Sequence, residues 1–171
     1  DEYVLSPDQI EVNQFLYDRI IIYNNEKFSK LDNSNGKFLF FPIIGKDPKH
    51  NYLFDKDSST PLWSYDTGNS VTSVSISVDG DYISVASAGN VYLFNKDSNT
   101  PLWSYTTGND VKAIDISEDG EFVVVGSEDD KIYLFDKDSS TPLWNANPDN
   151  QIVEWVDISA GGEYIVRAIT S

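Results

Sequence analysis

Apolar and small polar residues alternate along much of the chain, in short runs separated by turn-forming residues. Residues 71–77 (VTSVSIS) show the period of two that is typical of a half-buried β-strand. The dipeptide Asp79-Gly80 follows, and glycine tolerates the positive φ that a tight hairpin turn needs. Three further β-branched and aromatic runs complete a unit of four predicted strands. They are residues 82–86, 91–95 and 102–106.

The same unit recurs with a period of about 41 residues. The segment YLFDKDSSTPLW occupies residues 52–63 and 133–144, and YLFNKDSNTPLW occupies residues 92–103. The repeat places one tryptophan and one hairpin glycine in each unit. These are Trp63, Trp103 and Trp144, with Gly36, Gly80, Gly120 and Gly162. A four-stranded unit of about 40 residues, repeated in tandem, predicts an all-β fold of β-propeller blades.

The repeats divide the chain into one domain, residues 1–171, with about four blades' worth of strands. We expect blades at residues 28–66, 71–106 and 111–146, and a trailing half-blade at residues 151–171. Residues 1–27 form a degenerate leading half-blade, with strands expected at residues 2–6 and 18–24. Because an unpaired edge strand is an aggregation template, we expect the two half-blades to complete each other. They can do so within one chain, in a ring of two chains, or from chain to chain in a filament.

The unit resembles β-propeller blades of a hybrid type. Residues 71–82 look like the start of a WD40 blade, and residues 55–63 and 136–144 are similar to the tryptophan motif of PQQ-type propellers. Tandem copies of this kind resemble those of archaeal and bacterial cell-surface proteins. The resemblance is specific for the fold and indicates little about activity. Because near-identical units give a repetitive surface suited to scaffolding or adhesion, we expect a non-catalytic structural or protein-interaction module that is extracellular or located at the cell surface.

Three departures from these families limit what the resemblance implies. The sequence has no Gly-His and no Trp-Asp dipeptide, so the hydrogen-bonded tetrad of WD40 blades is missing. Pro61, Pro101 and Pro142 stand where PQQ motifs have glycine. The chain has no cysteine, whereas quinone-binding propellers use vicinal cysteines. Quinone-dependent dehydrogenase activity is therefore not carried over, and we expect no cofactor.

Composition excludes several classes of partner. The formal net charge is −16, so the surface repels nucleic-acid phosphates and anionic lipids. The longest apolar run, residues 38–44, has seven residues, whereas a membrane-spanning helix needs about 20. His50 is the one histidine, so a multi-histidine metal site cannot exist. We interpret His50 as an exposed loop residue.

The loops after the third strands hold acidic residues two positions apart, which is how calcium-binding loops begin. The candidates are Asp55, Asp57, Asp97, Asp136 and Asp138, with Asn95 in the remaining position. The glycine and bidentate glutamate that complete an EF-hand are absent. We therefore favour a hairpin loop in which these side chains accept hydrogen bonds from backbone amides, and we assign no metal site.

The repeated tryptophans could stack on sugars, but their recurrence once per unit favours packing between blades. Trp155 breaks the repeat, because it aligns with Ser73 and Ala113. It either fills a gap beside the degenerate blade or marks a contact surface. The acidic cluster at residues 128–130 is interpreted as a solvated turn.

No candidate catalytic residue stands out, since the acidic residues mostly follow the repeat. We expect a protein partner, which includes a second copy of this chain, and no enzymatic activity. One alternative is a self-assembling subunit of an extracellular sheath, surface layer or filament, joined through its half-blades. The other is a carbohydrate- or calcium-binding module.

Overall fold

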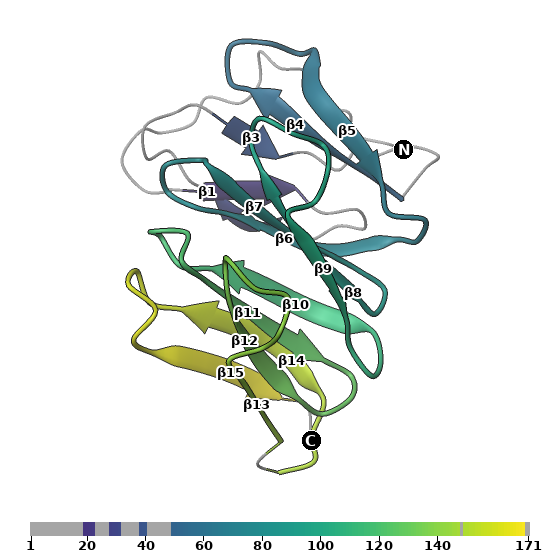
Figure 1. The fold of residues 1–171 in the computed structure, drawn as a ribbon, viewed down its shortest axis with the longest axis vertical. Helices are drawn as coiled ribbons and strands as arrows, with labels where there is room; N and C mark the ends of the chain where they lie inside the picture. The colour runs from purple at the N-terminus through teal and green to yellow at the C-terminus, as the bar shows by residue number, and fades with distance from the viewer. Residues whose placement is uncertain (1–18, 23–27, 32–37, 41–48, 148, 170–171) are drawn as a thin grey trace.

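The computed structural model describes residues 19–22, 28–31, 38–40, 49–147 and 149–169. Every regular element in these residues is a β-strand, and every strand pairing is antiparallel (Figure 1). The predicted all-β fold of four-stranded blades is therefore confirmed.

Two blades are complete, and each is a four-stranded meander in chain order. The second blade consists of β6 (Val71–Ile76), β7 (Tyr82–Ser87), β8 (Asn90–Asn95) and β9 (Trp103–Thr106). The third blade consists of β10 (Val111–Ile116), β11 (Phe122–Ser127), β12 (Ile132–Asp136) and β13 (Trp144–Ala146). Short turns join consecutive strands, which is why each strand pairs with its neighbour in sequence.

The first blade has three described strands, β3 (Phe38–Phe40), β4 (His50–Asp55) and β5 (Pro61–Asp66). Residues 28–31 were expected to open this blade, within residues 28–66. Instead, β2 (Phe28–Leu31) pairs with β1 (Arg19–Ile22) in a separate N-terminal strand pair. The expected strand at residues 2–6 and the hairpin glycine Gly36 lie outside the described residues.

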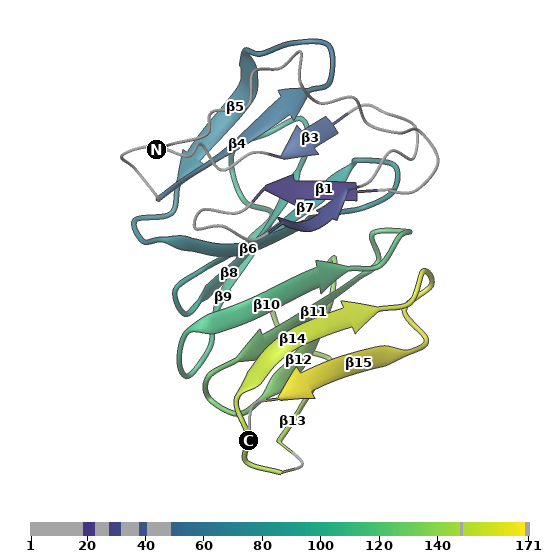
Figure 2. The ribbon, with the colours of Figure 1, turned by 180° about the vertical axis from the view of Figure 1, so that it is seen from behind.

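The chain finishes in a C-terminal half-blade, formed by β14 (Val153–Ile158) and β15 (Ile165–Ile169). These strands correspond to the first and second strands of a blade, and no described strand pairs with the free edge of β15. The sheets follow one another along the long axis of the molecule. The first blade lies at one end, and the third blade and the C-terminal half-blade lie together at the other (Figures 1 and 2).

Successive blades bury apolar side chains against each other. One core cluster joins the second and third blades and includes Val91, Leu93, Val125 and Phe135. Similar clusters lie between the first and second blades and between the third blade and the half-blade. Burial of one such side chain contributes about 1.5–3 kcal/mol, so each blade depends on its neighbours for its stability.

The hairpin turns are built as the sequence predicts. Gly80 has φ of 76°, in the left-handed region that favours glycine. Asp79 Oδ1 accepts hydrogen bonds from the Ser77 hydroxyl (2.6 Å) and from the backbone N–H of Asp81 (2.9 Å). The recurring Ser-x-Asp-Gly segment therefore encodes the turn by its own hydrogen bonds.

Candidate functional site

Each tryptophan of the first two blades is fixed by the following blade. The Trp63 ring lies 5.3 Å from the Phe94 ring, and its indole N–H donates to the Lys96 carbonyl at 2.7 Å. Trp103 repeats both contacts, with Phe135 at 5.3 Å and the Lys137 carbonyl at 2.8 Å. These tryptophans therefore pack between blades and are not free platforms for a ligand.

Trp144 departs from this arrangement, because 42% of its surface is exposed. The aromatic residue that should receive it belongs to the third strand of a blade, and the half-blade has only its first two strands. Among the described residues its indole N–H has no hydrogen-bond acceptor. The expected packing of Trp144 between blades is therefore absent, and its contact surface remains open.

The aromatic residue after the hairpin turn is also covered by the following blade in the second and third blades but exposed in the half-blade. Tyr82 lies against the turn of the third blade, where a Cβ added at Gly120 would come within 2.7 Å of the tyrosine ring. Phe122 lies against Gly162 of the half-blade in the same way. Tyr164 is the next residue in this series, and it is 80% exposed. In the part of the chain that the structure describes, no turn of a following blade covers Tyr164.

A row of polar side chains follows the first strands of successive blades. The Ser75 hydroxyl donates to Asp115 Oδ1 at 2.7 Å, and Asp115 Oδ2 accepts the backbone N–H of Ile158 at 3.2 Å. Asp115 is only 7% exposed, so its carboxylate has lost most of its hydrogen bonds to water. The bonds to Ser75 and Ile158 compensate for this loss. Asp157 occupies the same position in the half-blade and is exposed.

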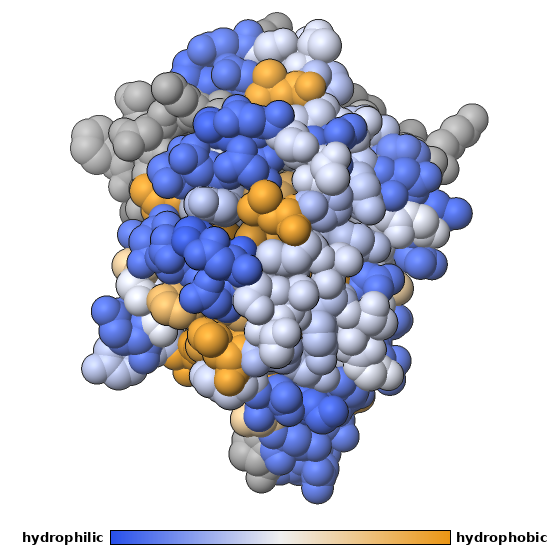
Figure 3. Space-filling model, viewed as in Figure 1, coloured by the Kyte–Doolittle hydropathy of each residue, from blue (hydrophilic) through white to orange (hydrophobic). Residues whose placement is uncertain are grey.

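Apolar positions confirm that one face of the half-blade is uncovered. Val124 of the third blade is fully buried, whereas Val166, at the same position of the half-blade, is 63% exposed. We call the uncovered surface the open face. It consists of Trp144, Trp155, Tyr164, Val166 and Ile169, each of which is more than 40% exposed. Figure 3 shows hydrophobic residues in separate small patches along the length of the face that it draws.

Trp155 lies on β14 and is 53% exposed. Of the two interpretations that the sequence left open, its exposure supports the contact surface. His50 is not in an exposed loop, as we had expected, but begins β4, where it is half-buried with its ring 5.9 Å from Tyr52.

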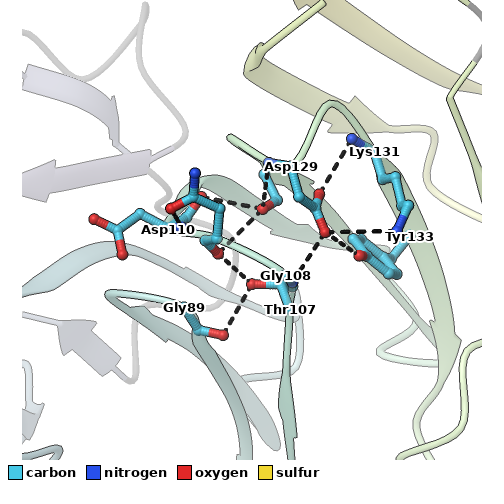
Figure 4. Close-up of polar contacts among 9 residues, drawn as sticks. Gly89, Thr107, Gly108, Asp110, Asp129, Lys131 and Tyr133 are labelled. Atoms are coloured by element: carbon cyan, nitrogen blue, oxygen red, sulfur yellow. Dashed lines mark hydrogen bonds and ion pairs between the residues drawn. The ribbon is translucent and has the colours of Figure 1, made fainter. Parts of the chain in front are cut away.

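The acidic cluster at residues 128–130 is more than a solvated turn. Asp129 Oδ2 accepts hydrogen bonds from the Tyr133 hydroxyl and from the backbone N–H of Gly108 at 2.9 Å (Figure 4). The other oxygen accepts the N–H of Lys131 at 3.2 Å. Burial and the bond to Asp129 raise the pKa of Tyr133 well above its usual value. This clasp fastens the connection between the second and third blades to a loop of the third blade, and sequence analysis missed it.

The calcium candidates form turns. Asp55 and Asp136 each accept the backbone N–H two residues later, at 2.9 and 2.8 Å, and Asn95 does the same at 3.0 Å. In each loop the second acidic residue contacts the preceding lysine. These residues are Asp57, Asp97 and Asp138. Within the described part of the chain, no three acidic or histidine residues converge on one point.

Comparison with known proteins supports the blade assignment. Among the described residues no helix has the length and apolarity needed to cross a membrane. No curated protein matches the chain. The PQQ_2 family model, described as outer membrane protein assembly factor BamB, matches residues 51–167, which is more than half of the sequence. The chain therefore belongs to this family of β-propeller-type repeat proteins.

Proposed function

We propose that this protein is a non-catalytic interaction module that binds a protein partner at its C-terminal half-blade. The observation that carries the proposal is the open face. Five of the eight large hydrophobic side chains exposed in the described structure belong to residues 144–169. Such a concentration of exposed apolar surface marks a protein interaction site.

The third blade indicates what the partner supplies. There, β11 pairs with β12 through Val124↔Leu134 and Gly126↔Ile132, and β12 pairs with β13. The free edge of β15 corresponds to the edge of β11 that β12 occupies. A β-strand from the partner would add to this edge by main-chain hydrogen bonds, and its side chains would cover Trp144.

The side chain that covers Trp144 should be aromatic, because Trp63 and Trp103 both lie against phenylalanine. The loop after this strand should present a backbone carbonyl two residues beyond that aromatic, as Lys96 and Lys137 do. The expected partner is therefore a two-stranded hairpin of the repeat type.

The family match supports a proposed location, and the net charge disfavours one class of partner. The matching family model is described as an outer membrane protein assembly factor, which supports a location in the cell envelope and is compatible with the proposed position at the cell surface. The net charge of −16 disfavours nucleic acid as a partner. The acids that depart from the repeat, Asp115 and Asp129, are engaged in contacts between blades, which supports a non-catalytic role.

The experiment uses a synthetic peptide of residues 130–146, which contains the third and fourth strands of the third blade. Its binding to the full chain is measured by fluorescence anisotropy at nanomolar chain concentration. We expect saturable binding at one site. Val166→Lys should weaken binding about two- to fivefold, because it replaces the apolar cross-strand partner of Leu134 in the peptide with a charged side chain. Leu62→Lys is the matched control, since Leu62 is 52% exposed but lies on the first blade.

A second peptide with Leu134→Ser and Phe135→Ser removes the apolar side chains while it keeps the turn. We expect it not to bind. If the native peptide fails to bind, or binds equally to the Val166→Lys chain, the open face is not an interaction site and the proposal is wrong.

A further inference from the structure

We propose that the partner at the open face is a second copy of this chain, and that its β1 and β2 complete the blade that β14 and β15 begin. This inference rests on the proposed function and names its partner. The contact is head to tail, because the N-terminal strand pair of one copy meets the C-terminal half-blade of the next.

The N-terminal strand pair has the pattern of the third and fourth strands of a blade. Residues 18–24 (DRIIIYN) match residues 130–136 (DKIYLFD), so Ile22 takes the position of Leu134. In the third blade Leu134 pairs with Trp144, and in the N-terminal pair Ile22 pairs with Phe28. In both strand pairs, the aromatic residue of the fourth strand is therefore the register partner of the same position of the third strand.

The half-blade at the other end has the pattern of first and second strands. Its register, Val156↔Arg167 and Ile158↔Ile165, repeats the register Ile114↔Val125 and Ile116↔Val123 of the third blade. The chain therefore carries both halves of one blade at opposite ends of its sequence. Together they make the four strands of a complete unit.

In the structure these halves form two separate two-stranded sheets. Outside its own sheet, β1 contacts β3 of the first blade. Figure 2 shows β10 and β14 lying between β1 and β15. The described strands of the two halves therefore do not pair with each other, and the inference assigns the half that completes β15 to a second copy of the chain.

Charge favours the same contact. The N-terminal segment 18–31 has more basic than acidic residues, in a chain whose net charge is −16. The half-blade segment 149–169 has mainly acidic residues. The charged residues concerned are Arg19, Lys27 and Lys30 with Asp18 and Glu26 in the first segment, and Asp149, Glu154, Asp157 and Glu163 with Arg167 in the second. Attraction between the two segments steers the head-to-tail encounter.

The register of the third blade predicts which residues would meet. Val124↔Leu134 and Gly126↔Ile132 become Val166↔Ile22 and Ala168↔Ile20 between copies. Beyond this strand pairing, the first blade of the second copy would follow the half-blade and cover Tyr164 and Val166. Two copies joined at both ends would give eight blades, within the range of closed propellers.

The first test is the mass of the full chain at micromolar concentration, measured by light scattering. We expect twice the 19.2 kDa of one chain, or a higher multiple if the ring stays open. Val166→Lys should return the mass to that of one chain. Leu102→Lys should leave the assembly intact, because Leu102 is 51% exposed and lies in the second blade, outside the proposed contact. A single-chain mass for the native protein overturns the inference. If that protein still binds the peptide of residues 130–146, the proposed function stands and only the second copy is excluded.

The second test locates the contact. Because the chain has no cysteine, any disulfide must form between the introduced cysteines. Chains carrying Val166→Cys are mixed with chains carrying Ile22→Cys under mild oxidation. Directly paired antiparallel residues have Cα atoms about 4.5–5.5 Å apart, which suits a disulfide. Arg19→Cys is the control, because three residues along a strand is about 10 Å. Assembly without the Val166–Ile22 disulfide, or with equal cross-linking at Arg19, overturns the proposed register.

Discussion

The indole N–H of Trp63 donates to the backbone carbonyl of Lys96, 33 residues later in the chain and in the following blade, at 2.7 Å. Trp103 makes the equivalent bond to Lys137. The tryptophan that defines the repeat in sequence is therefore the residue that connects one blade to the next in space. At Trp144 the repeat continues in sequence, but this connection is not made.

This difference predicts unequal costs for the same substitution. Trp103→Ala should lower the free energy of unfolding by about 3 kcal/mol, since it removes a large ring from the contact with Phe135 and leaves a cavity. Trp144→Ala should change it by less than about 1 kcal/mol when the chain is monomeric. Urea denaturation at low protein concentration measures both. Equal losses would show that Trp144 is as well packed as Trp103.

Asp115 should be more important for stability than Asp157, although both occupy the same place in their blades. Asp115→Ala leaves the Ser75 hydroxyl and the Ile158 N–H without their acceptor, and we expect a loss of about 2–3 kcal/mol. Asp157→Ala should be nearly neutral, because that carboxylate is exposed. Thermal unfolding of the two variants makes the comparison. A similar loss for Asp157→Ala would contradict the assignment of the buried row.

Alanine substitutions at Gly120 and Gly68 distinguish the cost of backbone strain from the cost of side-chain crowding. Both have positive φ, 75° and 76°, so alanine is strained at either position. At Gly120 the new methyl group would also press on the Tyr82 ring, whereas nothing lies within 4 Å at Gly68. We expect Gly68→Ala to cost about 1 kcal/mol and Gly120→Ala to cost about 1–3 kcal/mol more. Equal urea midpoints for the two variants would show that the turn of the third blade can move away from Tyr82.

The clasp at Asp129 predicts how stability changes in alkali. Burial and the hydrogen bond to Asp129 raise the pKa of Tyr133 above that of a tyrosine in the unfolded chain, near 10. The folded state then holds the proton more tightly, so this contribution is present below pH 10 and is lost as the pH rises further. Tyr133→Phe should flatten the fall of stability above pH 10. Urea midpoints measured from pH 8 upward test this, and an unchanged slope would exclude Tyr133 as its source.

Much of the fold could be predicted because the relevant signals are local. The expected strand at residues 71–77 is β6, and the turn that follows uses Gly80 and Asp79 as the sequence indicates. Alternation sets which face of a strand is buried, and a glycine with positive φ sets where the hairpin turns. Both are encoded within a few residues.

The rest depends on contacts between blades, which are distant in sequence. The segment FSKL at residues 28–31 looks equally suitable as the opening strand of one blade or the closing strand of another, and only the pairing Ile22↔Phe28 decides. Asp129 was read as solvated because its partners Gly108 and Tyr133 lie in two different elements. The signal for Asp115 was present, as a carboxylate at a strand position where the preceding blade has Ser75.

The indole N–H groups of Trp63 and Trp103 donate to backbone carbonyl oxygens, which every residue possesses. The receiving loops differ at two positions, Asn95 for Asp and Asn99 for Ser, and still accept the indole of the preceding unit. This attachment therefore does not depend on the identity of the loop residues, so the indole bond can be kept when a unit is copied, deleted or exchanged in order. A gene built in this way can change its length in steps of one whole unit while it preserves this bond at each junction.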